Sequence, residues 1–202
     1  MYALLSSEPY TLIIKGSRFL GELLNATSTS EAKEVVAAQR LKYPDATHVV
    51  HAMVAGPSGA ILGCSDDGEP AGTAGRPVLE VLKGSQLTNV VLTVTRWFGG
   101  TKLGTGGLVH AYSDCAKGVL ENAKIREIIA MRSLAFTVPY PLIESAQRVF
   151  AEYEFIVSAG NYDANGYAVQ GELPASHAED FMRRLADISR GKIIVESRTD
   201  NG

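Results

Sequence analysis

The sequence is poor in cysteine and contains no long apolar run. Its 202 residues include two cysteines, Cys64 and Cys115, which form neither a Cys-x-x-Cys pair nor part of a His/Cys metal spacing. We therefore expect both to be reduced and buried, without a redox or metal role. No apolar run approaches the roughly 18 residues that a membrane-spanning helix requires, so no membrane segment is expected.

The sequence also lacks an excess of positive charge. Its formal net charge is −3, with 12 Lys and Arg against 12 Asp and Glu in residues 1–130, and 7 against 10 in residues 131–202. Tight, sequence-independent binding of nucleic acid normally leaves a basic footprint. The composition therefore argues against a broadly basic surface and leaves open a contact through a local patch.

A signal peptide is a further absence, since the N-terminus has neither the basic region nor the small-residue cleavage site of one. This predicts a cytoplasmic location. Hydrophobic residues make up 46% and charged residues 20% of the chain, which is typical of a folded globular protein and not of a disordered one.

Glycine, by contrast, is concentrated in one stretch. Ten of the 20 glycines lie in residues 63–113. Glycine in a helix or strand interior costs about 0.5–1 kcal/mol relative to alanine, so such a cluster is typical of turns or of close approach by another group. We interpret this stretch as the functional surface and the flanking chain as its scaffold.

The first 130 residues predict a mixture of strands and helices. Ser28 and Glu31 form a capping box at the start of one helix, and the β-branched run 89–96 is typical of a central strand covered on both faces. Gly16 and Ser17 suit a two-residue hairpin turn. The expected strands are 10–15, 18–24, 46–55, 60–64, 89–96 and 125–130, and the expected helices are 28–43, 72–83 and 107–124.

Residues 131–202 predict a second domain with the order βαββαβ, the ferredoxin-like motif. One helix begins near Pro141, and the other begins at Ser176, with Glu179 completing a capping box, and ends before Gly191. The expected strands are 132–138, 155–162, 166–173 and 192–198. The chain is therefore predicted to be an α+β protein with domains 1–130 and 131–202.

The second glycine cluster predicts an anion site. A buried strand, a glycine-rich loop with a lysine and then a helix is an arrangement in which backbone N–H groups and the helix N-terminus favour an anion. The spacing matches neither a P-loop nor the dinucleotide fingerprint. The alternative is a tight turn that packs the helix on the sheet. The candidate anion-binding or nucleic-acid-binding residues are Arg96, Lys102, Gly99, Gly100, Gly104, Gly106, Gly107 and Arg76.

Acidic residues precede this cluster. Asp66, Asp67 and Glu69 can bind a divalent cation, do acid–base work, or neutralise Arg96, Arg76 and Lys102 in an ion-pair network. We favour the polar network, with His48 as a further member. No metal or other cofactor is expected.

Two long motifs carry a resemblance to a known family. Residues 65–77, SDDGEPAGTAGRP, and residues 96–113, RWFGGTKLGTGGLVHAYS, resemble the IMPACT family, specifically its bacterial YigZ-like branch. The sequence departs from the family pattern at Trp97 and at His110, where the family usually has tyrosine and arginine. The resemblance implies that the first domain has a fold like domain 2 of ribosomal protein S5. It also implies that the second resembles a ferredoxin-like domain of elongation factor G.

The resemblance and the anion-suited loop together favour a translation-associated regulatory protein that binds RNA or the ribosome and is not an enzyme. Two alternatives remain open. One is an enzyme that acts on a small anionic, phosphorylated metabolite, and the other is a module that binds only a protein partner.

Overall fold

The computed structural model describes residues 1–197, and its contacts divide the chain into two compact units, Met1–Ile128 and Ile129–Gly202. Each unit has a hydrophobic core of its own. Both mix helices with sheets that are antiparallel except for the β1–β6 pair, which confirms the predicted α+β class. No helix within residues 1–197 has the length and apolar character needed to cross a membrane.

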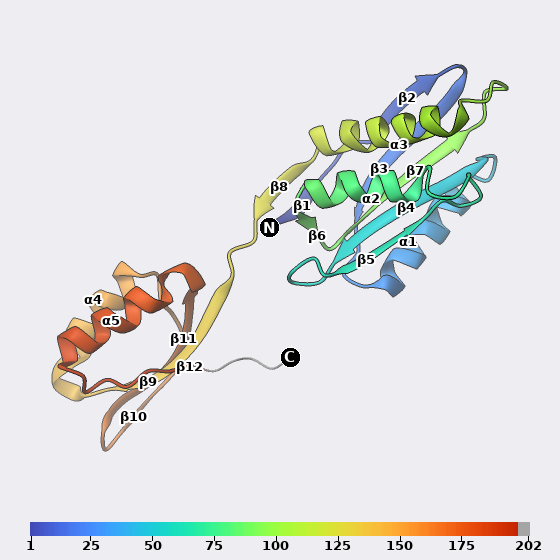
Figure 1. The fold of residues 1–202 in the computed structure, drawn as a ribbon. Helices are drawn as coiled ribbons and strands as arrows, with labels where there is room; N and C mark the ends of the chain where they lie inside the picture. Colours follow the sequence, from blue (N-terminus) through green and yellow to red (C-terminus); the bar gives the residue numbers. More distant parts are fainter. Residues whose placement is uncertain (198–202) are drawn as a thin grey trace. The chain divides into compact units, whose positions relative to one another are not determined.

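A five-stranded antiparallel sheet forms the centre of the first unit (Figure 1). Its strands lie in the order β2-β3-β7-β4-β5, and β7 is the middle strand, as its apolar composition predicted. The strand bounds are β2 Tyr10–Ile14, β3 Ser17–Asn25, β4 His48–Ala55, β5 Ile61–Ser65 and β7 Val90–Trp97.

Helices cover both faces of this sheet (Figure 1). On one face α2, Gly75–Gly84, and α3, Gly104–Glu121, enclose the main core. On the other face α1, Thr29–Lys42, packs over a smaller apolar cluster. The expected capping of α1 is present, since Ser28 accepts the N–H of Glu31, although the Glu31 carboxylate reaches back to Thr27 and not to Ser28.

A three-stranded sheet in the first unit was not predicted. It consists of β1, Tyr2–Ser6, between β6, Leu87–Thr88, and β8, Lys124–Glu127. The strands are short and distant in sequence, and β1 has a single buried side chain, Leu4, so periodicity gives little signal.

Three local predictions for the first unit were wrong in detail. The β2–β3 turn uses Lys15 and Gly16, both with positive φ, so Ser17 already belongs to β3. Helix α3 begins at Gly104, three residues earlier than expected, because residues 105–106, expected as loop, are already helical, while Gly104 itself has positive φ. Cys115 is buried, but Cys64 is exposed.

The second unit has a four-stranded antiparallel sheet in the order β10-β11-β9-β12, with α4, Ile143–Glu152, and α5, Ala178–Ser189, packed on its core. The predicted order βαββαβ is confirmed. The strand bounds are β9 Met131–Val138, β10 Ile156–Asp163, β11 Gly166–Pro174 and β12 Glu196–Ser197, and short 3-10 turns, η1 Tyr140–Leu142 and η2 Ala175–His177, precede the helices.

The predicted cap at Ser176 was wrong, and the predicted last strand is only partly present in the described residues. Ser176 lies in η2 and caps no helix, and Glu179 pairs with Arg132 instead. The last strand was expected over 192–198, but only Glu196–Ser197 pairs with β9, and residue 198 lies outside the described residues.

We predict that a fragment of residues 1–128 folds without the second unit, because the core beneath α2 and α3 and the cluster beneath α1 lie wholly within it. Its urea unfolding, followed by circular dichroism, should be a single cooperative transition. A broad, non-cooperative loss of signal would contradict this, and the full chain unfolded under the same conditions is the control.

Candidate anion-binding site at the start of helix α3

A buried ion pair organises the end of the first unit at which α3 begins. Arg96, near the end of β7, is 4% exposed, and Glu69, from the loop after β5, is 8% exposed. The Nη1 atom of Arg96 lies 2.5 Å from Oε1 of Glu69, and its Nη2 donates to the Ser17 hydroxyl at 3.3 Å. The guanidinium therefore ties the loop to both β7 and the start of β3.

Glu69 has two further neighbours. The hydroxyl of Tyr112, on the buried face of α3, donates to Oε1 of Glu69 at 2.8 Å. Burial and the adjacent Glu69 charge raise the pKa of Tyr112 well above its ordinary value, so this hydroxyl keeps its proton. Glu69 thus connects α3 to Arg96 through a single carboxylate oxygen.

His48 completes the cluster from β4. Its Nε2 lies 3.8 Å from Oε1 of Glu69, and its Nδ1 lies 2.8 Å from the carbonyl oxygen of Asp67. Burial lowers the pKa of His48, and the nearby Arg96 and Arg40 charges lower it further, although Glu69 opposes them. A carbonyl can only accept, so Nδ1 carries the hydrogen of the neutral ring.

Asp66 and Asp67 each hold the backbone rather than joining Glu69. The Asp66 carboxylate accepts the N–H groups of Gly72, Ala74 and Gly75 and so caps α2. Asp67 accepts the N–H of Val49 and pairs with Arg40. Within residues 1–197 no three His, Cys, Asp or Glu side chains gather in a way that could hold a metal ion.

A pocket of about 330 Å³ lies beside this network, at the N-terminus of α3. Its lining comes from the loop that carries Glu69, from the end of β7 and from the start of α3. The lining residues are Glu69, Pro70, Arg96, Phe98, Lys102, Leu103, Gly104, Thr105 and Leu108. The pocket therefore brings together Arg96, Lys102 and Gly104 of the predicted anion site.

Lys102 and the first turn of α3 give this pocket its positive character. Lys102 is exposed and makes no hydrogen bond or ion pair within the part of the chain that the structure describes. Leu103, at the N-cap position, offers no side-chain acceptor, and the first turn of α3 has no acidic residue. The first N–H groups of the helix thus remain free to bind an anion.

The five candidate glycines differ in whether and why the structure requires glycine at their positions. Gly99 approaches the β2–β3 turn so closely that a Cβ would lie 1.9 Å from the carbonyl carbon of Gly16, and Gly107 packs on Leu103. Gly100 and Gly104 have positive φ, which glycine adopts without strain. Only Gly106 has ordinary backbone and open space where a Cβ would stand.

Arg76 lies outside the pocket. It lies on α2 and lines a shallow hollow with Gly72 and Pro77 on its own side and with Val109 and Lys117 of α3. The structure therefore separates Arg76 from Lys102, so the prediction that both belong to one anion site was wrong for Arg76.

Ser17, Tyr112 and Phe98 were missed as site residues. The sequence pattern placed Tyr112 on the apolar face of α3. A buried tyrosine hydroxyl needs a hydrogen-bond partner, and Glu69 of the acidic loop is that partner, so this contact could have been predicted. No local signal marks Ser17, because its partner Arg96 is 79 residues away. Phe98, at 47% exposure, lies two residues after Arg96 and contributes to the pocket wall.

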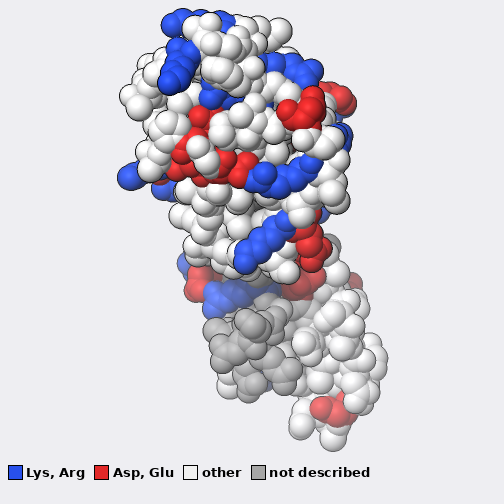
Figure 2. All heavy atoms as spheres, turned by 90° about the vertical axis from the view of Figure 1, so that its right-hand side faces the viewer, with Lys and Arg blue, Asp and Glu red and all other residues white. Residues whose placement is uncertain are grey.

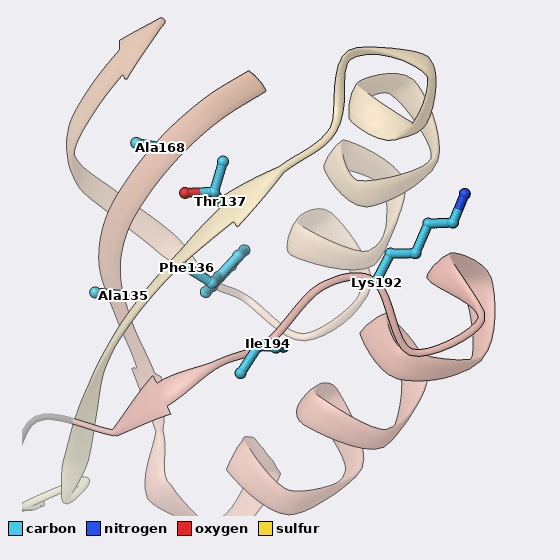
Figure 3. Close-up of a pocket in the computed structure, with 6 residues that line it drawn as sticks. All are labelled: Ala135, Phe136, Thr137, Ala168, Lys192 and Ile194. Atoms are coloured by element: carbon cyan, nitrogen blue, oxygen red, sulfur yellow. The ribbon is translucent and has the colours of Figure 1, made fainter. Parts of the chain in front are cut away.

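A pocket in the second unit is comparable in size but chemically different (Figure 3). It measures about 390 Å³ and is lined by Ala135, Phe136, Thr137, Ala168, Lys192 and Ile194. Lys192 is the single charged side chain among these lining residues. The pocket at α3 has the richer set of anion-binding groups.

The surface around the start of α3 has mixed charge. Figure 2 looks onto this end of the first unit, and Lys and Arg side chains there lie next to a patch of Asp and Glu. The view shows no continuous basic surface. Any anion contact on this face is therefore local.

Comparison with known proteins places the chain among relatives of matching length. A family model described as the Impact N-terminal domain matches residues 15–120, and a domain of unknown function, DUF1949, matches residues 136–192. The IMPACT family member YigZ of Escherichia coli is 34% identical, over 94% of this chain and 95% of its own. The IMPACT family member YvyE of Bacillus subtilis is 35% identical, over 93% and 86%.

A solved structure shares the whole fold. The crystal structure of a hypothetical protein is 32% identical, with a TM-score of 0.65, and the alignment covers 99% of this chain and 98% of the other. The alignment therefore spans both units.

We predict that Asp66→Ala destabilises the protein at pH 7 by about 1–2 kcal/mol, because three N–H groups at the start of α2 lose their acceptor. Burial acts to raise the pKa of Asp66, but the three N–H donors outweigh it and lower the pKa. A carboxylate with a lowered pKa stabilises the fold above its unfolded pKa, and this stability is lost as pH falls through the folded pKa.

The difference between wild type and Asp66→Ala should therefore shrink below about pH 4. Urea unfolding across this range measures it, and Asp114→Ala, which removes an exposed acid of α3, is the control. A difference that stayed constant into acid would contradict the assignment.

We also predict that Glu69→Ala and Arg96→Ala each cost about 3–5 kcal/mol, because either change leaves a buried charge without its partner. Lys102→Ala should stay within about 0.5 kcal/mol of wild type, since Lys102 is exposed. Denaturant midpoints test this ranking. Equal midpoints for Glu69→Ala and wild type would show that the pair does not hold the site together.

Proposed function

This chain belongs to the IMPACT family, and on that basis we propose that it acts in the regulation of translation by holding a phosphate group of RNA or of the ribosome in the pocket at the start of α3. The observation that carries this proposal is that the pocket contains positive groups that no acidic side chain neutralises. Lys102 has no partner among the described residues, and the uncapped α3 N-terminus lies beside it.

The charge distribution limits the size of the contact. Arg96 is offset by Glu69 at 2.5 Å, so Lys102 and the helix N-terminus supply the net attraction. The first 130 residues have equal numbers of acidic and basic side chains. We therefore expect the pocket to neutralise one or two phosphates and not a long stretch of backbone.

An enzymatic function is less well supported. Glu69 is bound to Arg96 and to Tyr112, and Asp66 and Asp67 are used by the backbone and by Arg40. An acid–base catalyst needs a carboxyl or imidazole free to exchange a proton with the substrate. His48 is the remaining candidate, and it is not among the residues that line the pocket.

We predict that the protein sediments with ribosomal particles from a lysate, and that Lys102→Ala reduces this fraction roughly tenfold through loss of a charged contact. Lys33→Ala, which removes an exposed lysine of α1 on the opposite face of the sheet, is the matched control and should sediment like wild type.

Salt provides an independent measure. The logarithm of the binding constant should fall with the logarithm of salt concentration by about 0.7–0.9 per phosphate neutralised, giving a total slope of roughly −1 to −2. Wild-type protein that stays at the top of the gradient in low salt would overturn the proposal.

A further inference from the structure

We propose that the pocket at the start of α3 selects the terminal phosphate of a nucleotide, a phosphate monoester, over the internal phosphodiesters of a nucleic-acid chain. The inference rests on the proposed function, because it concerns the same pocket and names the chemical group that the pocket takes. Five features of the site support this proposal. They are the size of the pocket, the number of its hydrogen-bond donors, the unpaired Nε of Arg96, the glycine at position 106 and the exposed ring of Phe98.

The pocket is a short recess and not a track. Its volume of about 330 Å³ is at the lower end of small-molecule sites. Proteins that follow a nucleic-acid backbone use a basic groove along several nucleotides. Among residues 1–197, Lys102 and Arg96 are the only cationic side chains that line this pocket, and Glu69 already pairs with Arg96. The pocket thus suits one phosphate.

The donors exceed what a phosphodiester needs. The uncapped N–H groups of Gly104, Thr105 and Gly106, the Thr105 hydroxyl and the Lys102 ammonium lie at the start of α3. A phosphodiester offers two non-bridging oxygens and a single negative charge. A phosphate monoester offers three oxygens and a charge of about −1.5 to −2 at pH 7, which matches this donor set better.

Arg96 is a second, independent sign of a ligand. It is buried and lines the pocket, and its Nε has no hydrogen-bond partner among the described residues. Its other two nitrogens are held by Glu69 and Ser17, so the side chain is fixed in place. A buried donor without a partner costs free energy unless another group satisfies it.

Gly106 adds a third observation. A helical glycine costs about 1 kcal/mol relative to alanine, yet neither the backbone nor the packing of the protein requires one at this position. Close approach of an external group to the first turn of α3 would require it. Gly106 directly follows Thr105, which lines the pocket, whereas Gly84 is likewise helical and open but is the last residue of α2, so it provides a matched control.

Phe98 indicates that the phosphate is attached to a flat group. Its ring is 47% exposed at the pocket wall, and the Arg96 guanidinium carbon lies 5.6 Å from the ring centroid. An exposed aromatic face next to a phosphate site is suited to stacking on a nucleobase. A nucleoside phosphate is therefore the ligand that fits both ends of the pocket.

The test compares ends of one RNA. A fluorescent single-stranded RNA of about ten nucleotides would be titrated by anisotropy in three forms, with a 5′-phosphate, with a 3′-phosphate, and with hydroxyls at both ends. The expected result is that one phosphorylated form binds at least about tenfold more tightly than the hydroxyl form. Nucleoside monophosphates as competitors distinguish a free nucleotide, which would then bind as tightly as the RNA, from an RNA end.

Two glycine variants locate the effect. Gly106→Ala should stay folded, because a Cβ there meets no other atom, and weaken binding of the phosphorylated RNA roughly tenfold, because the added methyl group would stand beside the first-turn N–H donors. Gly84→Ala should bind like wild type. Equal loss in both variants, or no loss in Gly106→Ala, would overturn the proposal.

Failure of this inference can be told apart from failure of the proposed function. If all three RNAs bind equally, internal phosphates are recognised, so the inference falls while RNA binding stands. If none binds but ribosome sedimentation still depends on Lys102, the inference alone fails. If sedimentation is absent as well, both fail.

Discussion

The ion pair between Arg96 and Glu69 is the interaction on which the arrangement of the site depends. It joins the end of the central strand to the acidic loop, while Tyr112 adds α3 and Ser17 adds the first hairpin. Four segments far apart in the sequence therefore meet at two buried charges. Since a buried charge is tolerated only with its partner present, none of the four segments can move independently.

This pairing also separates the charges that support the fold from those that remain available. Asp66 caps α2, Asp67 pairs with Arg40 and Glu69 pairs with Arg96. Lys102 has no such partner among the described residues, and no side chain caps the N-terminus of α3. The motif thus contains paired charges, mostly acidic, that support the fold, and unpaired positive groups that line the pocket.

Sequence patterns predicted the long elements well and the site only in part. The continuous apolar run of β7 and the caps of α1 are local signals, and they gave the right elements. The small sheet around β1 and the contact of Ser17 with Arg96 depend on residues distant in the chain, which no local pattern reports. Arg76 and Lys102 both looked suited to an anion, but α2 and α3 direct them to different hollows.

The balance of charge around the pocket has a kinetic consequence. Asp and Glu side chains stand beside Lys and Arg on this face (Figure 2), so no long-range field draws a polyanion toward it. For the phosphate group proposed above, encounters would then be set by diffusion and orientation, at about 10⁵–10⁷ M⁻¹ s⁻¹, and selection would lie in how slowly the bound group leaves. A pocket of this kind would bind free nucleic acid slowly and would suit a phosphate group that other contacts already hold nearby.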